Sequence, residues 1–138
     1  MRSYEQIDRE KEAYVTAANK ALSKMRDKSA RWWNYSVSHS TFDLVVGDPQ
    51  GSENILLSLA DCQYLAGAMK WNEQQIEVVF KCDRTKQQRV WNFILQDESA
   101  GFKAIAGVFE WRKNFNLLKH LHSPNYRSGE NVNNTDVF

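Results

Sequence analysis

The sequence predicts an α+β domain in which one long N-terminal helix packs on a curved antiparallel sheet, or a partly open barrel, of about six strands. No glycine or proline occurs before Gly47, and the apolar residues over 4–31 follow a helical spacing. From Tyr35 onward the apolar residues alternate as they do in strands, and short polar turns separate the runs. Because short links join antiparallel neighbours, and no second helical stretch is left for parallel crossovers, we expect the sheet to be antiparallel.

The helix is predicted over residues 4–31. Ser3 and Gln6 form a capping-box pattern at its start. The apolar residues on one stripe are Ile7, Tyr14, Ala18, Ala21, Leu22 and Met25. A helix of this length would be roughly 40 Å long, which is longer than a small domain is wide. We therefore expect it to bend, to overhang the domain or to meet another subunit.

Residues 35–118 carry the strand signals. Apolar side chains alternate or cluster in several short segments, which are 42–46, 55–59, 76–82 and 91–95. Turn residues separate the strands at 47–51, 61–63, 72–74, 83–86 and 97–101. We assign residues 1–122 to one domain. Residues 123–138 are rich in Asn, Ser, Gly and Asp, which predicts a disordered polar tail.

One seven-residue pattern occurs twice. Residues 65–71 read LAGAMKW and residues 105–111 read IAGVFEW, with Ala, Gly and Trp identical. We interpret both copies as strands in equivalent registers, a pattern that duplication or chance could produce. Gly67 and Gly107 would then lie on the same packed face as the tryptophan that ends each copy. Each glycine would leave room there for a neighbouring aromatic ring.

The composition limits the classes of function. The net charge of +1 gives no overall case for nucleic acid, and the two cysteines are too few for a disulfide scaffold. The charge is uneven, because residues 1–31 hold eight Lys/Arg against five Asp/Glu, whereas residues 32–111 hold six against ten. No apolar run is as long as a membrane span, and no apolar segment follows the N-terminus. We therefore expect a soluble, cytoplasmic protein.

No pattern of catalytic or metal-binding residues is strong. His39 and Asp43 share a face of one predicted strand but lie roughly 13 Å apart along it, too far for an acid–base pair. Cys62 and Cys82 belong to no CxxC pair and fit small buried side chains. The histidines within residues 120–122 stand beside the predicted tail, with no acidic or Cys ligand near them in sequence. We therefore predict no metal and no cofactor.

Two sets of candidate site residues remain. The first is a basic row on the predicted helix, which could bind an acidic protein partner, RNA or the acidic sheet region of another copy; a solvated surface is the plain alternative. Its members are Lys20, Lys24, Lys28 and Arg31. The second is a set that could line a cavity for a small apolar ligand, and a well-filled core is its plain alternative. Its members are Trp33, His39, Trp71, Trp91 and Trp111.

The sequence therefore favours a small non-enzymatic binding or protein-interaction domain that self-associates, most simply as a homodimer. The alternative is a small enzyme or ligand carrier whose aromatic-lined cavity lies between the helix and the curved sheet. RNA binding through the basic helix is a weaker alternative, because the net charge gives nucleic acid little support. No motif identifies the ligand or the partner.

Overall fold

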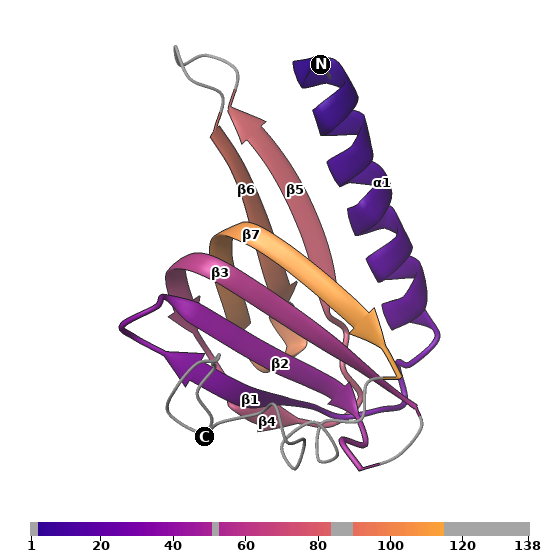
Figure 1. Ribbon diagram of the computed structural model, residues 1–138. Helices are drawn as coiled ribbons and strands as arrows, with labels where there is room; N and C mark the ends of the chain where they lie inside the picture. The colour runs from indigo at the N-terminus through magenta and orange to yellow at the C-terminus, as the bar shows by residue number, and fades with distance from the viewer. Residues whose placement is uncertain (1–2, 51–52, 84–89, 115–138) are drawn as a thin grey trace, which may run out of the picture.

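The computed structural model describes residues 3–50, 53–83 and 90–114 (Figure 1). Within them, one helix leads into seven strands, with one short 3-10 turn before the last. The elements are α1 (Tyr4–Ser23), β1 (Ala30–Ser36), β2 (Thr41–Gly47), β3 (Asn54–Ala66), β4 (Lys70–Trp71), β5 (Glu77–Asp83), β6 (Val90–Asp97), η1 (Glu98–Ala100) and β7 (Phe102–Lys113). The predicted tail at 123–138 and the histidines within 120–122 lie outside the described residues.

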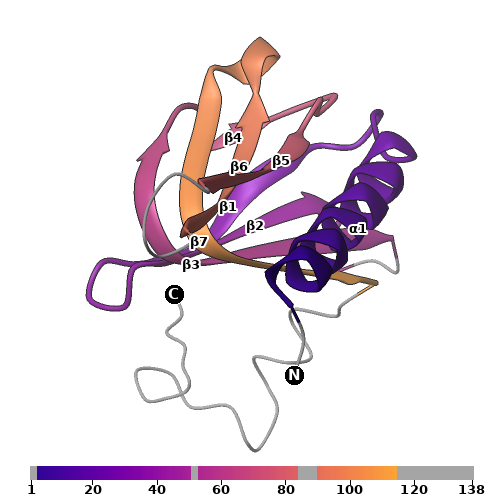
Figure 2. The same ribbon diagram turned by 90° about the horizontal axis from the view of Figure 1, so that it is seen from above.

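The strands form one antiparallel sheet in the order β4-β1-β2-β3-β7-β6-β5, which is curved and not closed. Every pairing between neighbours is antiparallel. The helix packs beside this sheet and covers part of its concave side (Figure 2). The predicted α+β class, with an N-terminal helix on a curved antiparallel sheet, is therefore confirmed.

The helix begins where the sequence predicts. The Ser3 hydroxyl accepts a hydrogen bond from the Gln6 amide at 3.2 Å, and the Gln6 side chain accepts one from the Ser3 amide at 2.8 Å. This capping box satisfies two of the amides that a helix start leaves without partners. Among the described residues, no helix is both long enough and apolar enough to cross a membrane.

The helix ends at Ser23, so the predicted extension to residue 31 is wrong. The buried side-chain amide of Gln74 donates hydrogen bonds to the carbonyls of Leu22 at 3.1 Å and Met25 at 2.9 Å. These bonds supply partners for carbonyls at the helix end, and the chain turns into β1 instead of continuing. At 20 residues α1 is about 30 Å long. Its length therefore no longer calls for a second subunit.

β3 and β7 are the longest strands, and each bends midway (Figures 1 and 2). β3 bends at Asp61, whose φ of 54° lies in the left-handed region, so the turn predicted at 61–63 is a bend within one strand. β7 bends at the facing position, near Gly107. Its core-facing residues before the bend include Ala106, whereas after it they include Phe109, so the alternation of faces shifts by one.

α1 lies in the gap that the bent sheet leaves between β5 and the end of β7 (Figure 2). β5 ends the sheet, and β7 pairs with β6 only up to Ala106, so both strands have edge groups that need partners. The Asn19 side chain donates to the Val78 carbonyl and accepts from the Val78 amide, both at 2.8 Å. The Tyr14 hydroxyl accepts from the Trp111 amide at 3.0 Å and donates to the Trp111 carbonyl at 3.4 Å. The helix therefore takes the place of a missing strand.

The two copies of the seven-residue pattern are not equivalent, so that interpretation is wrong. Residues 65–71 run out of β3, through a bend at Gly67, into β4, whereas residues 105–111 lie wholly within β7. Gly67 has a φ of 121°, and a Cβ added there would lie 2.4 Å from the Gly101 carbonyl oxygen. At Gly107 an added Cβ would meet an Asp61 carboxylate oxygen at 2.6 Å rather than an aromatic ring. The sequence pattern does not distinguish a corner between two strands from a bend within one strand.

Candidate interaction surface

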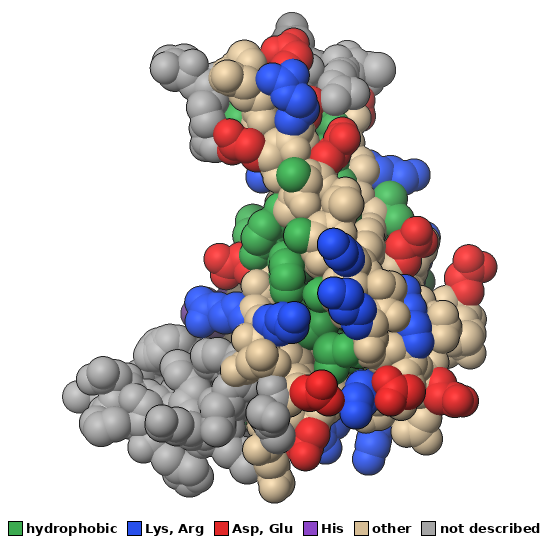
Figure 3. Space-filling model, turned by 90° about the vertical axis from the view of Figure 1, so that its right-hand side faces the viewer, with side chains coloured by type: hydrophobic (Ala, Val, Ile, Leu, Met, Phe, Trp, Pro, Cys, Tyr) green, Lys and Arg blue, Asp and Glu red, His purple; other side chains and the backbone are tan. Residues whose placement is uncertain are grey.

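The four basic candidates do not form one helical row. Lys20 lies on α1 and Lys24 caps its end, and both are exposed. Lys28 lies in the turn that follows, and Arg31 belongs to β1, so placing these two on the helix is wrong. On the helix-bearing side several basic side chains lie near the middle of the view, with acidic side chains above, below and beside them (Figure 3). This mixed surface differs from the continuous basic groove that nucleic acid requires.

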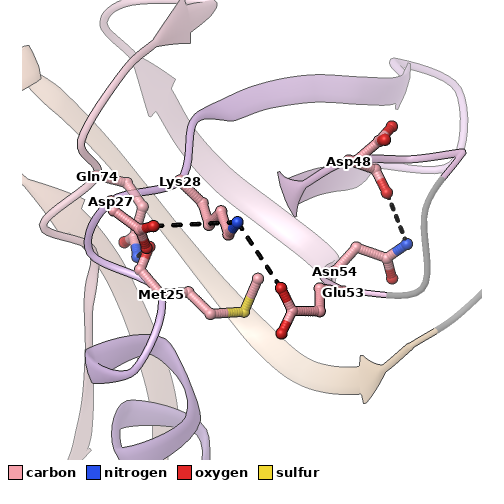
Figure 4. A network of polar contacts seen from close by, with 7 residues as sticks. All are labelled: Met25, Asp27, Lys28, Asp48, Glu53, Asn54 and Gln74. Carbon is pink, nitrogen blue, oxygen red and sulfur yellow. Dashed lines mark hydrogen bonds and ion pairs between the residues drawn. The ribbon is translucent and has the colours of Figure 1, made fainter.

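Lys28 and Arg31 line an open depression of about 780 Å³ beside the turn after α1. Its charged lining residues are three bases and three acids, which are Lys28, Arg31, Lys70, Asp27, Asp48 and Glu53. The Lys28 amine lies 3.9 Å from the Asp27 carboxylate and 3.7 Å from the Glu53 carboxylate (Figure 4). Opposite charges therefore compensate one another within the depression, and nothing there selects a ligand of either sign.

Trp71 is held by a buried carboxylate at the end of β6. The indole N–H of Trp71 and the backbone amide of Gln75 both donate to Asp97, each at 2.7 Å, and Ser99 donates to it as well. Burial raises the pKa of Asp97, but the hydrogen bonds from Ser99, Gln75 and Trp71 outweigh it and hold the pKa below its ordinary value. This carboxylate ties β4 and the link after it to β6, and so acts as a structural joint.

Trp91 and Trp111 join α1 to the sheet. The Trp91 indole N–H donates to the buried Asp8 carboxylate at 2.6 Å, and the Lys11 amine lies 5.4 Å from the centre of a Trp91 ring. Trp111 packs on Tyr14 with ring centres 6.2 Å apart. The Trp111 indole nitrogen is buried without a hydrogen-bond partner among the described residues. Both rings are therefore occupied by contacts with the helix.

The remaining two candidates lie elsewhere. Trp33 packs on Val45 on the face of the sheet turned away from the core, and the Arg31 guanidinium lies 5.6 Å from the centre of its ring. His39 is exposed in the turn between β1 and β2, where its Nδ1 lies 3.0 Å from the Ser38 hydroxyl oxygen. The structure therefore does not bring Trp33, His39, Trp71, Trp91 and Trp111 together around one space.

The outer face of the sheet, which is turned away from the core, carries a row of apolar side chains across four strands. Ile105 of β7 lies opposite Tyr64 of β3 and also opposite Ile94 of β6, and Ile94 in turn lies opposite Val79 of β5. Tyr64 is 50% exposed, and the other three are partly exposed. We call Val79, Ile94, Ile105 and Tyr64 the outer apolar row.

Polar side chains frame the outer apolar row on both sides. The first flanking row, with members opposite one another on β5, β6 and β7, consists of Glu77, Gln96 and Lys103. The second flanking row consists of Lys81, Asn92 and Asp61. Lys81 lies opposite Asn92, and the Asp61 carboxylate lies over Gly107, two positions beyond Ile105. An apolar centre with a polar, charged rim is the usual anatomy of a protein-binding surface.

A different part of the outer face holds a carboxyl with the opposite pKa shift to Asp97. Asp43 of β2 lies between Asn34 of β1 and Ser58 of β3. Burial raises its pKa above the ordinary value, although the hydrogen bonds from Ser58 and Asn34 partly oppose the shift. The Arg112 charge also lowers the pKa, and the Glu110 charge raises it, but the two side chains that hydrogen-bond to the carboxyl are neutral, which favours a structural role over an acid–base one.

The outer apolar row has a sequence signal that differs from those of the predicted sites. β5, β6 and β7 each contain a run of three consecutive apolar residues, at 78–80, 93–95 and 104–106, and β2 and β3 contain such runs at 44–46 and 55–57. Such runs break the alternation expected of a strand with one buried face, and they place apolar side chains on both faces. The signal marks the residues, but only the register of the strands shows that the outward ones align into a row.

No family model, no curated protein and no solved structure matches this chain. Within the described residues, no group of three or more His, Cys, Asp and Glu side chains is placed to hold a metal ion.

Proposed function

We propose that this chain is a small non-enzymatic protein-interaction domain that self-associates, most simply as a homodimer, through the outer face of β5, β6 and β7. The observation that carries the proposal is the outer apolar row, which crosses four strands and is only partly buried by the domain itself. Covering exposed apolar surface with another protein lowers the free energy, and an apolar patch rimmed by charged residues is typical of such a contact. The outer face is the convex side of the sheet, and a convex surface suits contact with another protein better than a small ligand, which binds in a concave pocket.

A ligand carrier or a small enzyme with an aromatic cavity has less support. Its expected lining residues are in separate surroundings, and the indole nitrogens of Trp71 and Trp91 already donate to carboxylates. An acidic protein partner and RNA have less support for a similar reason, because Lys28 is paired with acidic side chains and Arg31 lies against Trp33. A cytoplasmic location remains part of the proposal, and the free thiols of Cys62 and Cys82 suit a reducing compartment.

Sedimentation velocity over a range of protein concentrations tests the proposal. We expect the wild type to shift from monomer to dimer as the concentration rises, and Ile94→Lys to remain monomeric because it places a charge in the middle of the outer apolar row. Thr16→Lys, which adds the same charge at an exposed position of α1, is the matched control and should associate as the wild type does. A wild type that stays monomeric throughout, or equal association of both variants, would contradict the proposal.

A further inference from the structure

The two flanking rows are complementary to each other, and this complementarity identifies the occupant of the outer face. The first row carries an acid on β5, an amide on β6 and a base on β7, which are Glu77, Gln96 and Lys103. The second row carries a base on β5, an amide on β6 and an acid over β7, which are Lys81, Asn92 and Asp61. On β5, on β6 and over β7, therefore, the residue on one side of the outer apolar row matches the residue on the other side.

We propose that a second copy of this chain packs on the outer face, related to the first by a two-fold axis that runs along the outer apolar row. This inference rests on the proposed function and adds the orientation of the two copies. Rotation about such an axis exchanges the two flanking rows, so the first row of each copy faces the second row of the other. Glu77 of one copy then lies opposite Lys81 of the other, and Lys103 lies opposite Asp61.

The spacing of a sheet supports this arrangement. Residues two positions apart on a strand lie about 6.8 Å apart, so each flanking row runs within one side-chain length of the apolar row. Sheets that pack face to face lie about 10 Å apart, which Glu–Lys and Lys–Asp pairs can bridge. Glu77, Lys81, Lys103 and Asp61 are all exposed, so their charges are available for pairing between copies.

The amide pair on β6 adds a second observation. The side-chain oxygen of Asn92 is buried and has no hydrogen-bond partner among the described residues. An acceptor without a partner costs free energy, which a new donor recovers. In the two-fold arrangement Gln96 of the second copy lies opposite Asn92, and its side-chain N–H groups can donate to this oxygen once the Asn92 amide turns outward.

The size of the patch sets the expected strength. Four strands spaced about 4.8 Å apart, each contributing five residues, give a face roughly 15–20 Å across in each direction. Its area is therefore roughly 200–400 Å², which is small beside the roughly 800 Å² per partner of a standard interface. We therefore expect a dissociation constant in the micromolar range. Because the rim consists of exposed charge pairs, the orientation of the dimer depends on them more than its overall affinity does.

Reciprocal charge reversal tests the two-fold arrangement. In Glu77→Lys both residues of the facing pair are basic, and in Lys81→Glu both are acidic, so each variant alone opposes like charges twice across the axis. We expect each to dimerise at least about tenfold more weakly than the wild type at low salt. In an equimolar mixture of the two variants, both facing pairs again carry opposite charges. Sedimentation of the mixture should show a heterodimer of near wild-type affinity, and the gain should shrink at about 0.5 M salt.

Matched reversals on α1 separate this effect from general attraction between oppositely charged proteins. Glu12→Lys and Lys20→Glu change the net charge by the same amounts at exposed helix positions. We expect both to dimerise as the wild type does, with no gain on mixing. A wild type that remains monomeric overturns the arrangement together with the proposed function. A wild type that dimerises, combined with no gain on mixing the Glu77 and Lys81 variants or an equal gain for the helix pair, overturns the two-fold arrangement alone.

Discussion

The strands β5, β6 and β7 present two faces that use apolar side chains differently. On the inner face Val78, Phe93 and Leu95 are buried in the core with residues of α1 and the rest of the sheet. On the outer face Val79 and Ile94 alternate with them along the same strands but are only partly buried. Adjacent residues of similar character therefore have different consequences, since the inner ones stabilise the domain and the outer ones leave apolar surface for another molecule to cover.

Polar groups differ between the two sides in the same way. Where the sheet meets the helix, Asn19 supplies a donor and an acceptor to the edge of Val78, so the backbone there is satisfied. On the outer side the Asn92 oxygen has no partner among the described residues. The buried Trp111 indole nitrogen at the helix joint also lacks a partner among the described residues, so an unpaired group alone does not distinguish the two sides. The Asn92 oxygen differs in lying on a face with exposed apolar residues, where another molecule can supply a donor.

Truncating two adjacent residues of β6 tests most directly whether the inner and outer faces contribute differently to stability. Leu95 is fully buried, so Leu95→Ala should lower the free energy of unfolding by about 2–5 kcal/mol, because it leaves a cavity in the core. Ile94→Ala should cost about 1 kcal/mol or less, because its side chain is only partly buried by the monomer. Urea unfolding at a protein concentration low enough to keep the chain monomeric measures both. Equal losses would show that both faces belong to the core of one domain.

Removing the hydrogen bonds between α1 and β5 should cause the next largest loss in the free energy of unfolding. Asn19→Ala removes both partners of the Val78 backbone, and we expect a loss of about 1–3 kcal/mol in the free energy of unfolding. Lys20→Ala, at the next and exposed helix position, is the control and should change it by about 0.5 kcal/mol or less. If the two variants unfold at the same urea concentration, the helix does not close the sheet edge through this amide.

Two carboxyls have the smallest expected effects on the free energy of unfolding, and they change it with pH in opposite directions. The pKa of Asp97 is lowered, so its stabilisation is present above pH 3.8 and is lost as the pH falls through the lower value in the folded protein. The pKa of Asp43 is raised, so stability instead decreases as the pH rises from 3.8 through the higher folded value. Asp97→Asn should flatten the dependence of unfolding free energy below pH 3.8, and Asp43→Asn should flatten it above.

Urea unfolding of the two asparagine variants and the wild type across acidic pH measures these slopes. Both substitutions keep the size of the side chain but also replace one acceptor oxygen with an NH2 group. The change of stability with pH, and not the absolute stability, therefore reports the effect of the charge. Slopes of the same sign for the two carboxyls would mean that the hydrogen bonds from Ser99, Gln75 and Trp71 do not outweigh burial at Asp97.

The sequence predicts the parts of the fold that depend on local chemistry. The capping box at Ser3 and Gln6 is made by residues three apart, so the start of α1 follows from the sequence directly. The end of α1 depends on Gln74, which lies about fifty positions further along the chain, and no pattern near residue 23 marks it. For this reason the helix was predicted too long, and the basic row that the extra turns would have carried does not exist.

The candidate site was harder to predict because it depends on register. The aromatic residues have another role, because Trp71 and Trp91 hold β4 and α1 in place through Asp97 and Asp8. The outer apolar row consists of ordinary aliphatic residues and one tyrosine, which become a surface only when four strands align them. The bend at Gly107 likewise reverses the faces of β7 in a way that alternation along one strand does not reveal.

We propose that the outer face, and not the helix or the core, binds a second copy of this chain. Methyl NMR of protein labelled at isoleucine tests it residue by residue, over concentrations from about 10 µM to about 500 µM that span the expected micromolar dissociation constant. We expect the Ile94 and Ile105 methyl signals to shift with concentration and those of the buried Ile55 and Ile76 to stay fixed. Constant Ile94 and Ile105 signals, with a concentration-dependent shift at Ile7 on α1, would contradict it.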